Sequence, residues 1–88
     1  MRKFNKQEIE TKVKEAISEE LGIDVEQITM DSKMADDLKA DSIDAVDITM
    51  HIERDFCITV PDEKFYAMTA CKVCDICELV DQLQSRRA

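Results

Sequence analysis

Apolar residues recur at helical spacing near both ends of the chain. The N-terminal stretch has one every four positions and is followed by Gly22, a residue that commonly ends a helix. Its apolar positions are Ile9, Val13, Ile17 and Leu21. The C-terminal stretch predicts a helix over about 73–84, with apolar positions at Val73, Ile76, Cys77, Val80 and Leu83.

The middle of the chain predicts two more helices. Asp41 and Ser42 are good helix N-caps, so a second helix should begin there and run to about Phe56. A β-branched stretch over 57–60 is closed by Pro61, and Pro61 with the acids that follow it should start a short third helix. The long connection over 22–41 carries apolar anchors at Ile23, Val25, Ile28, Met34 and Leu38.

These elements predict an all-α protein. We expect a four-helix bundle with a long loop between helices 1 and 2 and a short helix 3, in a single domain over 1–88 with a core of about 7–84. One Gly, one Pro and no Trp in 88 residues agree with a helical chain. So small a domain has room for one core and little room for an elaborate catalytic pocket.

The second predicted helix has two apolar faces. On a helical wheel of about 100° per residue, the core stripe consists of Ala45, Ile48, Thr49, Ile52 and Phe56. A second stripe lies nearly opposite, made of Ile43, Val46 and Met50 and flanked by Asp44, Asp47 and Glu53. Either the long loop covers this second stripe, or it is exposed as a surface for transient protein docking. The periodicity leaves both alternatives open.

The negative charge of the chain restricts the classes of molecule that it can bind. The net charge is −8, and residues 15–81 carry 18 acidic against five basic residues. Such a field repels nucleic acid and anionic membrane surfaces and steers basic protein surfaces toward the domain. No signal peptide or long apolar run is visible, so we expect a cytoplasmic monomer that binds neither nucleic acid nor membrane.

The stretch Leu38-Lys39-Ala40-Asp41-Ser42-Ile43-Asp44 resembles the phosphopantetheine attachment motif of acyl carrier proteins. Other features of that family stand in register with the motif. Residues 46–56 are similar to its recognition helix, and Ile58-Thr59-Val60-Pro61-Asp62-Glu63 is similar to the segment before its third helix. The resemblance covers roughly residues 7–83.

The resemblance implies a carrier whose cofactor is a covalent 4'-phosphopantetheine arm on Ser42. A phosphopantetheinyl transferase would join the Ser42 hydroxyl to the arm through a phosphodiester, and acyl intermediates of fatty-acid or related biosynthesis would ride on the terminal thiol as thioesters. A polyketide, aminoacyl or lipid-modification pathway is the alternative. The only histidine is His51, and no base is spaced to activate Ser42, so we expect no catalytic residue and no enzyme activity.

The resemblance also implies a docking surface for acyl-synthesis enzymes with basic patches. Its residues would be Asp41, Ile43, Asp44, Val46, Asp47, Met50 and Glu53. Three positions depart from the family pattern. Lys39 stands where a glycine is common, so the loop must turn there without glycine's freedom. His51, which we expect to be exposed, and Arg54 interrupt the acid-rich helix.

Two other functions are compatible with parts of the pattern. Cys71, Cys74 and Cys77 have ligand-like spacing, which would suit a small metal or redox protein. A fourth cysteine is missing at Asp81, and Cys77 shares the core stripe while Cys74 points elsewhere, so we expect free thiols and no metal site. The second of these functions is a helical adaptor that binds partners through the stripe of Ile43, Val46 and Met50 without any use of Ser42.

Overall fold

The computed structural model describes residues 3–85, without the side chains of residues 65 and 66. It contains the helices α1 (Lys6–Leu21), η1 (Val25–Gln27), α2 (Ser42–Phe56), α3 (Asp62–Ala67) and α4 (Val73–Ser85), of which η1 is a single 3-10 turn. Residues 3–85 form no β-strand, and an isolated antiparallel bridge joins Lys33 to Lys72. The predicted all-α fold, with a long first connection and a short third helix, is confirmed.

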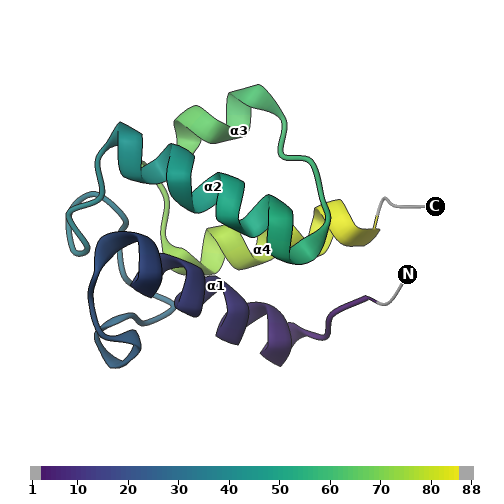
Figure 1. The fold of residues 1–88 in the computed structure, drawn as a ribbon, viewed down its shortest axis with the longest axis horizontal. Helices are drawn as coiled ribbons and strands as arrows, with labels where there is room; N and C mark the ends of the chain where they lie inside the picture. Colours follow the sequence, from purple (N-terminus) through teal and green to yellow (C-terminus); the bar gives the residue numbers. More distant parts are fainter. Residues whose placement is uncertain (1–2, 86–88) are drawn as a thin grey trace.

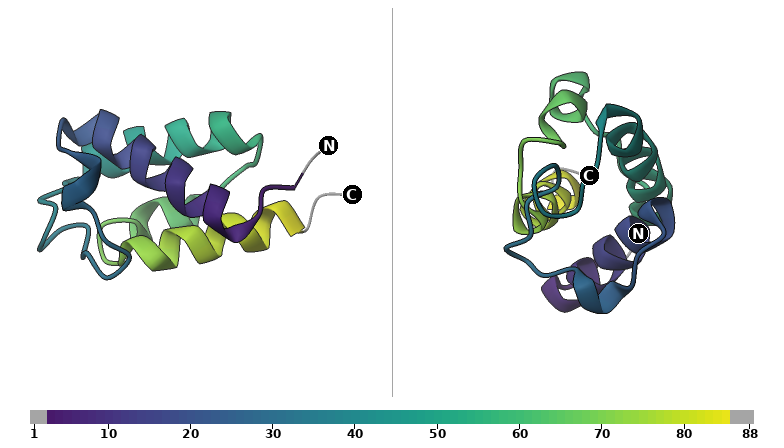
Figure 2. Two further views of the ribbon diagram at one scale, coloured as in Figure 1. Left: turned by 90° about the horizontal axis from the view of Figure 1, so that it is seen from below. Right: turned by 90° about the vertical axis from the view of Figure 1, so that its left-hand side faces the viewer.

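Helix α1 packs against both α2 and α4, and α3 packs against α2 (Figure 1). The views agree that the long loop before α2 lies at one end of the bundle, together with the connection into α4 (Figure 2). The first residue of α2 is therefore at the loop end. Both ends of the described chain lie at the other end of the bundle.

The core consists of the stripes that the sequence predicts. Helices α1, α2 and α4 bury Ile9, Val13, Ala16, Ile17, Ala45, Ile48, Thr49, Ile52, Phe56, Val73, Ile76, Cys77 and Val80. Burying a large aliphatic side chain is worth about 1.5–3 kcal/mol, so this packing fixes how each helix is rotated about its axis. Leu21 and Leu83, at the ends of two stripes, are only half-buried.

The long loop is pinned to the core by fewer anchors than expected. Ile28 and Met34 are buried, and Ile23 and Leu38 are partly buried against the core. Val25 is 40% exposed, so its prediction as an anchor was wrong. Val25 begins the 3-10 turn, and Ile28 follows it with an extended backbone, at φ −102° and ψ 122°.

Backbone hydrogen bonds hold the middle of the loop against the start of α4. The N–H of Val73 donates to the carbonyl of Ser32 at 3.0 Å, and the N–H of Cys74 donates to that of Met30 at 2.9 Å. The first N–H groups of a helix have no partner within the helix, so the loop satisfies two of them. These hydrogen bonds therefore hold the loop at the end of the bundle where α4 begins.

The two ends of the described chain are joined by one side chain. The N–H of Phe4 donates to Oε1 of Gln84 at 3.0 Å, and Nε2 of Gln84 donates to the carbonyl of Phe4 at 2.7 Å. The ring of Phe4 meets the ring of Phe56 edge-on, with 5.0 Å between centroids. This contact links the N-terminal segment to the last turn of α2.

Three of the residues that the structure describes adopt the left-handed conformation. Gly22 ends α1 with φ 67°, as its position predicts. Lys39 has φ 61°, which confirms that the loop turns there without a glycine. Cys57 has φ 53° and ends α2, where its N–H donates to the carbonyl of Glu53; this conformation was not predicted. A residue with a Cβ is strained in this conformation by about 1–2 kcal/mol.

The strain at Lys39 predicts a stabilising substitution. Lys39→Gly should raise the free energy of unfolding by about 0.5–1 kcal/mol, because relief of the strain exceeds the extra chain entropy of glycine in the unfolded state. Urea denaturation of the two proteins measures the difference. Lys33→Gly is the matched control, since Lys33 is an exposed loop lysine without a positive φ. It should not stabilise, and equal gains from both substitutions would contradict the explanation.

Candidate functional site

Helix α2 begins with a reciprocal pair of hydrogen bonds. The carboxylate of Asp41 accepts from the N–H of Asp44 at 2.8 Å, and the carboxylate of Asp44 accepts from the N–H of Asp41 at 3.1 Å. This capping box fixes Ser42 as the first residue of the helix, where its side chain is exposed. The expected start of the helix is confirmed.

The environment of Ser42 suits an attached anion. Because Asp41 takes the N–H of Asp44, the N–H groups of Ser42 and Ile43 remain as the outward donors of the first turn. Together with the positive end of the helix dipole, they favour a phosphodiester on the Ser42 oxygen. The site therefore fits a phosphopantetheine group.

Among the side chains that the structure describes, none is placed to activate the Ser42 hydroxyl as a nucleophile. The single histidine, His51, lies nine positions further along α2, which is about 13 Å of helix. Its ring is held by carboxylates at 2.9 to 3.3 Å.

The second apolar stripe of α2 is exposed. Ile43 is 71% exposed, Val46 is 42% exposed and Met50 is 58% exposed. We call these three residues the apolar strip. The alternative in which the long loop covers them is wrong, because that loop is tied to the start of α4.

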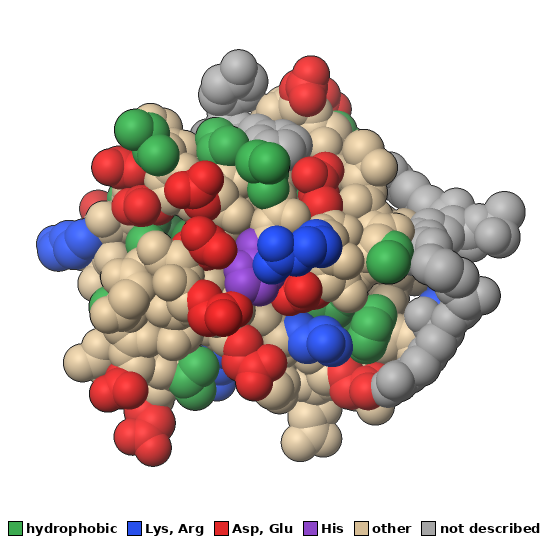
Figure 3. Space-filling view, viewed as in Figure 1, with side chains coloured by type: hydrophobic (Ala, Val, Ile, Leu, Met, Phe, Trp, Pro, Cys, Tyr) green, Lys and Arg blue, Asp and Glu red, His purple; other side chains and the backbone are tan. Residues whose placement is uncertain are grey.

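Acidic side chains surround the apolar strip, and some of them also hold the fold together. Asp47 is exposed, whereas Asp41 and Asp44 form the capping box. Glu53 is half-buried, and its carboxylate accepts a hydrogen bond of 2.7 Å from the N–H of Val60. Acidic groups are numerous on the face that Figure 3 shows.

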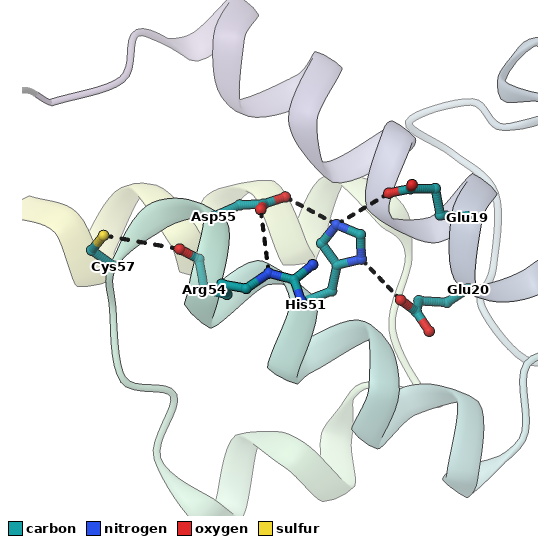
Figure 4. A network of polar contacts seen from close by, with 6 residues as sticks. All are labelled: Glu19, Glu20, His51, Arg54, Asp55 and Cys57. Carbon is teal, nitrogen blue, oxygen red and sulfur yellow. Dashed lines mark hydrogen bonds and ion pairs between the residues drawn. The ribbon is translucent and has the colours of Figure 1, made fainter.

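His51 is buried, so its prediction as an exposed residue was wrong. It is 7% exposed and lies against α1, where its ring nitrogens meet Glu19 and Glu20; Asp55, one turn further along α2, completes the contacts (Figure 4). A helical wheel of α2 alone could not show which side chains of α1 come opposite. In the sequence, only the adjacent Glu19 and Glu20 at the end of α1 could have indicated that His51 has acidic partners. Arg54, by contrast, is exposed.

Two of the cysteines, Cys71 and Cys77, have thiols whose pKa is raised, which favours the protonated form. Burial raises the pKa of Cys71 to about 11, assisted by the charge of Asp75, and burial raises the pKa of Cys77 to about 12, assisted by Glu10. Metal ligation requires the thiolate. Within the described part of the chain, no three His, Cys, Asp or Glu side chains are grouped so that they could hold a metal ion. Cys71, Cys74 and Cys77 therefore give a metal or redox function no support.

A cavity of about 280 Å³ lies between α3 and α4. Its apolar lining includes Ala67, Met68, Ile76 and Leu79, and Cys71 lies at the same wall. Lys64 and Glu78 also border it, so the cavity has an apolar wall and a charged margin.

Comparison with known proteins agrees with this geometry. The family model of the phosphopantetheine attachment site matches residues 11–71, a span that includes Ser42 and all of α2. An acyl carrier protein of Guillardia theta is 51% identical over 60 residues, which make up 68% of this chain and 74% of that protein. An acyl carrier protein of Thermotoga maritima is 48% identical over 58 residues, 66% of this chain and 72% of its own length. The chain therefore belongs to the acyl carrier protein family, whose members are not enzymes and carry acyl groups as thioesters on phosphopantetheine in fatty-acid biosynthesis.

Proposed function

We propose that the Ser42 hydroxyl is the attachment point of the 4'-phosphopantetheine arm and that a separate phosphopantetheinyl transferase installs it. The observation that carries this proposal is the exposure of Ser42 at the capped first position of α2, inside the matched span. The bound arm supplies a terminal thiol that holds the acyl group as a thioester.

The contribution of the chain is to position the attachment oxygen. The capping box keeps Ser42 at the helix start, and the first-turn N–H groups of Ser42 and Ile43 face the phosphodiester. The carboxylates of Asp41 and Asp44 are turned to backbone N–H groups, which lessens their repulsion of the phosphate. Serine is required because it places an oxygen on a short, accessible side chain.

We infer that the apolar strip and the acids around it form the docking surface for the transferase and for acyl-synthesis enzymes. The surface consists of Asp41, Ile43, Asp44, Val46, Asp47, Met50 and Glu53. The exposed apolar centre supplies contact area, and its acidic rim attracts basic patches. Met50 lies about 12 Å along the helix from Ser42, so a docked enzyme has the attachment point within reach.

Three further features of the function remain predictions. No helix within residues 3–85 is long and apolar enough to cross a membrane. A cytoplasmic location and a monomeric state are expected from the sequence alone. Which acyl-synthesis enzymes dock here also remains to be measured.

The attachment proposal is tested by intact-protein mass spectrometry after incubation with coenzyme A and a phosphopantetheinyl transferase. The wild-type protein should gain the mass of one phosphopantetheinyl group, and Ser42→Ala should gain none. Ser85→Ala is the matched control, because Ser85 is an exposed serine in α4, and it should be modified like the wild type. Modification of Ser42→Ala, or an unmodified wild type with several transferases, would refute the proposal.

The docking surface is tested by placing a charge in the apolar strip. Met50→Glu should lower the kcat/KM of the transferase reaction about tenfold or more, because an added carboxylate disrupts the apolar contact. The fold should be retained, since the side chain is largely exposed. Val25→Glu is the control, because Val25 is an exposed apolar residue outside α2. If both variants are modified at the wild-type rate, the strip is not the docking surface.

A further inference from the structure

His51 is held by carboxylates of two helices. Its Nδ1 lies 2.9 Å from Oε2 of Glu20, and its Nε2 lies 3.3 Å from Oε2 of Glu19. Both glutamates belong to α1, and Oδ2 of Asp55, on α2 itself, lies 3.1 Å from Nε2 (Figure 4). Each ring nitrogen therefore faces at least one carboxylate oxygen.

The number of hydrogen-bond donors decides which form of the ring suits this arrangement. A neutral imidazole has one N–H donor and one lone pair, whereas an imidazolium has two N–H donors. An ionised carboxylate only accepts. A neutral His51 would thus turn its lone pair toward a carboxylate oxygen, on the side of Glu20 or on the side of Asp55 and Glu19. The observed contacts are satisfied on both sides only when the cluster holds one additional proton.

The end of α1 gives the cation a second role. Glu19 and Glu20 lie in the last turn of α1, at the negative end of the helix dipole, and that turn contains no basic residue. Acids at this end of a helix are unfavourable. A charged His51, which belongs to α2, places a positive charge beside the last turn of α1, where α1 itself has no basic residue. Arg54 also lies nearby, but its Nε is 3.9 Å from Oδ1 of Asp55 and its side chain is exposed.

We propose that His51, Glu19, Glu20 and Asp55 form a proton-binding clamp that holds α1 and α2 together while His51 is charged. When the ring loses its proton, one of its two sides loses a hydrogen bond and three carboxylates remain around a neutral group. The contact between the helices then weakens, so the folded state should be less stable once the cluster has lost this proton. The clamp is independent of the modification of Ser42.

The protonation state can be observed directly, because His51 is the only histidine of the chain. Long-range ¹H–¹⁵N correlation spectra of the folded wild-type protein at about pH 6 should show protons on both ring nitrogens. The signals should change to those of a neutral imidazole when the pH is raised far enough to remove the proton. A neutral ring at the lower pH in the folded protein would refute the clamp.

The link between the proton and stability is tested by urea denaturation at two pH values. Between about pH 5.5 and about pH 8, the unfolding equilibrium constant of the wild type should rise about fivefold or more relative to that of His51→Gln. The other acids are common to both proteins, so their repulsion cancels in this ratio. Equal pH dependence in the two proteins would refute the clamp.

Two further variants separate the clamp from a general effect of charge. Glu20→Gln removes the acceptor of Nδ1 and should reduce the pH dependence, whereas Glu26→Gln removes an exposed acid of η1 and should leave it unchanged. Equal effects of the two substitutions would contradict the proposal. The wild type is also measured with a metal chelator, and a pH dependence that disappears with the chelator would show that a metal ion holds the cluster instead of a proton.

Discussion

The proposed attachment site depends on the position at which helix α2 begins. The capping box of Asp41 and Asp44 fixes that position, and the buried side chains of Ile48 and Ile52 fix the rotation of the helix. A start one residue earlier or later would turn the helical face by about 100° relative to its cap. Ser42 would then no longer stand at the first position. One local interaction therefore sets both the place of the attachment oxygen and the face that remains exposed.

The acidity of the chain is useful for docking and costly for folding, and the structure uses several acids in hydrogen bonds that reduce this cost. The two longest helices, α1 and α2, each begin with a capping box. In α1 the carboxylate of Glu8 takes part in it, and in α2 the carboxylates of Asp41 and Asp44 do so. Glu53 accepts the N–H of Val60, and the acids at the end of α1 gather around His51. The proposed docking surface and the fold thus share the carboxylates of Asp41, Asp44 and Glu53, so we expect a change of charge at these positions to affect both stability and recognition.

The sequence predicts the features that depend on local periodicity and capping. The helices, their core stripes and the start of α2 follow from the chain itself, whereas the turn at Lys39 was expected from the family pattern, in which a glycine is common there. The features it could not predict depend on packing between distant segments. The burial of His51 requires Glu19 and Glu20 from another helix, and the exposure of the apolar strip depends on hydrogen bonds that draw the loop toward α4. Val25 was misplaced because the backbone direction after η1 is not encoded in its apolar character.

The pair of hydrogen bonds between Phe4 and Gln84 affects how the protein can be tethered. Its two hydrogen bonds bring the entry and exit of the described chain together at one end of a bundle about 35 Å long, and Ser42 lies at the other end. A linker fused to either terminus would therefore hold the protein at the end of the bundle opposite Ser42. The phosphopantetheine arm would point away from the anchor, and tethering the protein to a surface or to a neighbouring enzyme would leave its working end accessible.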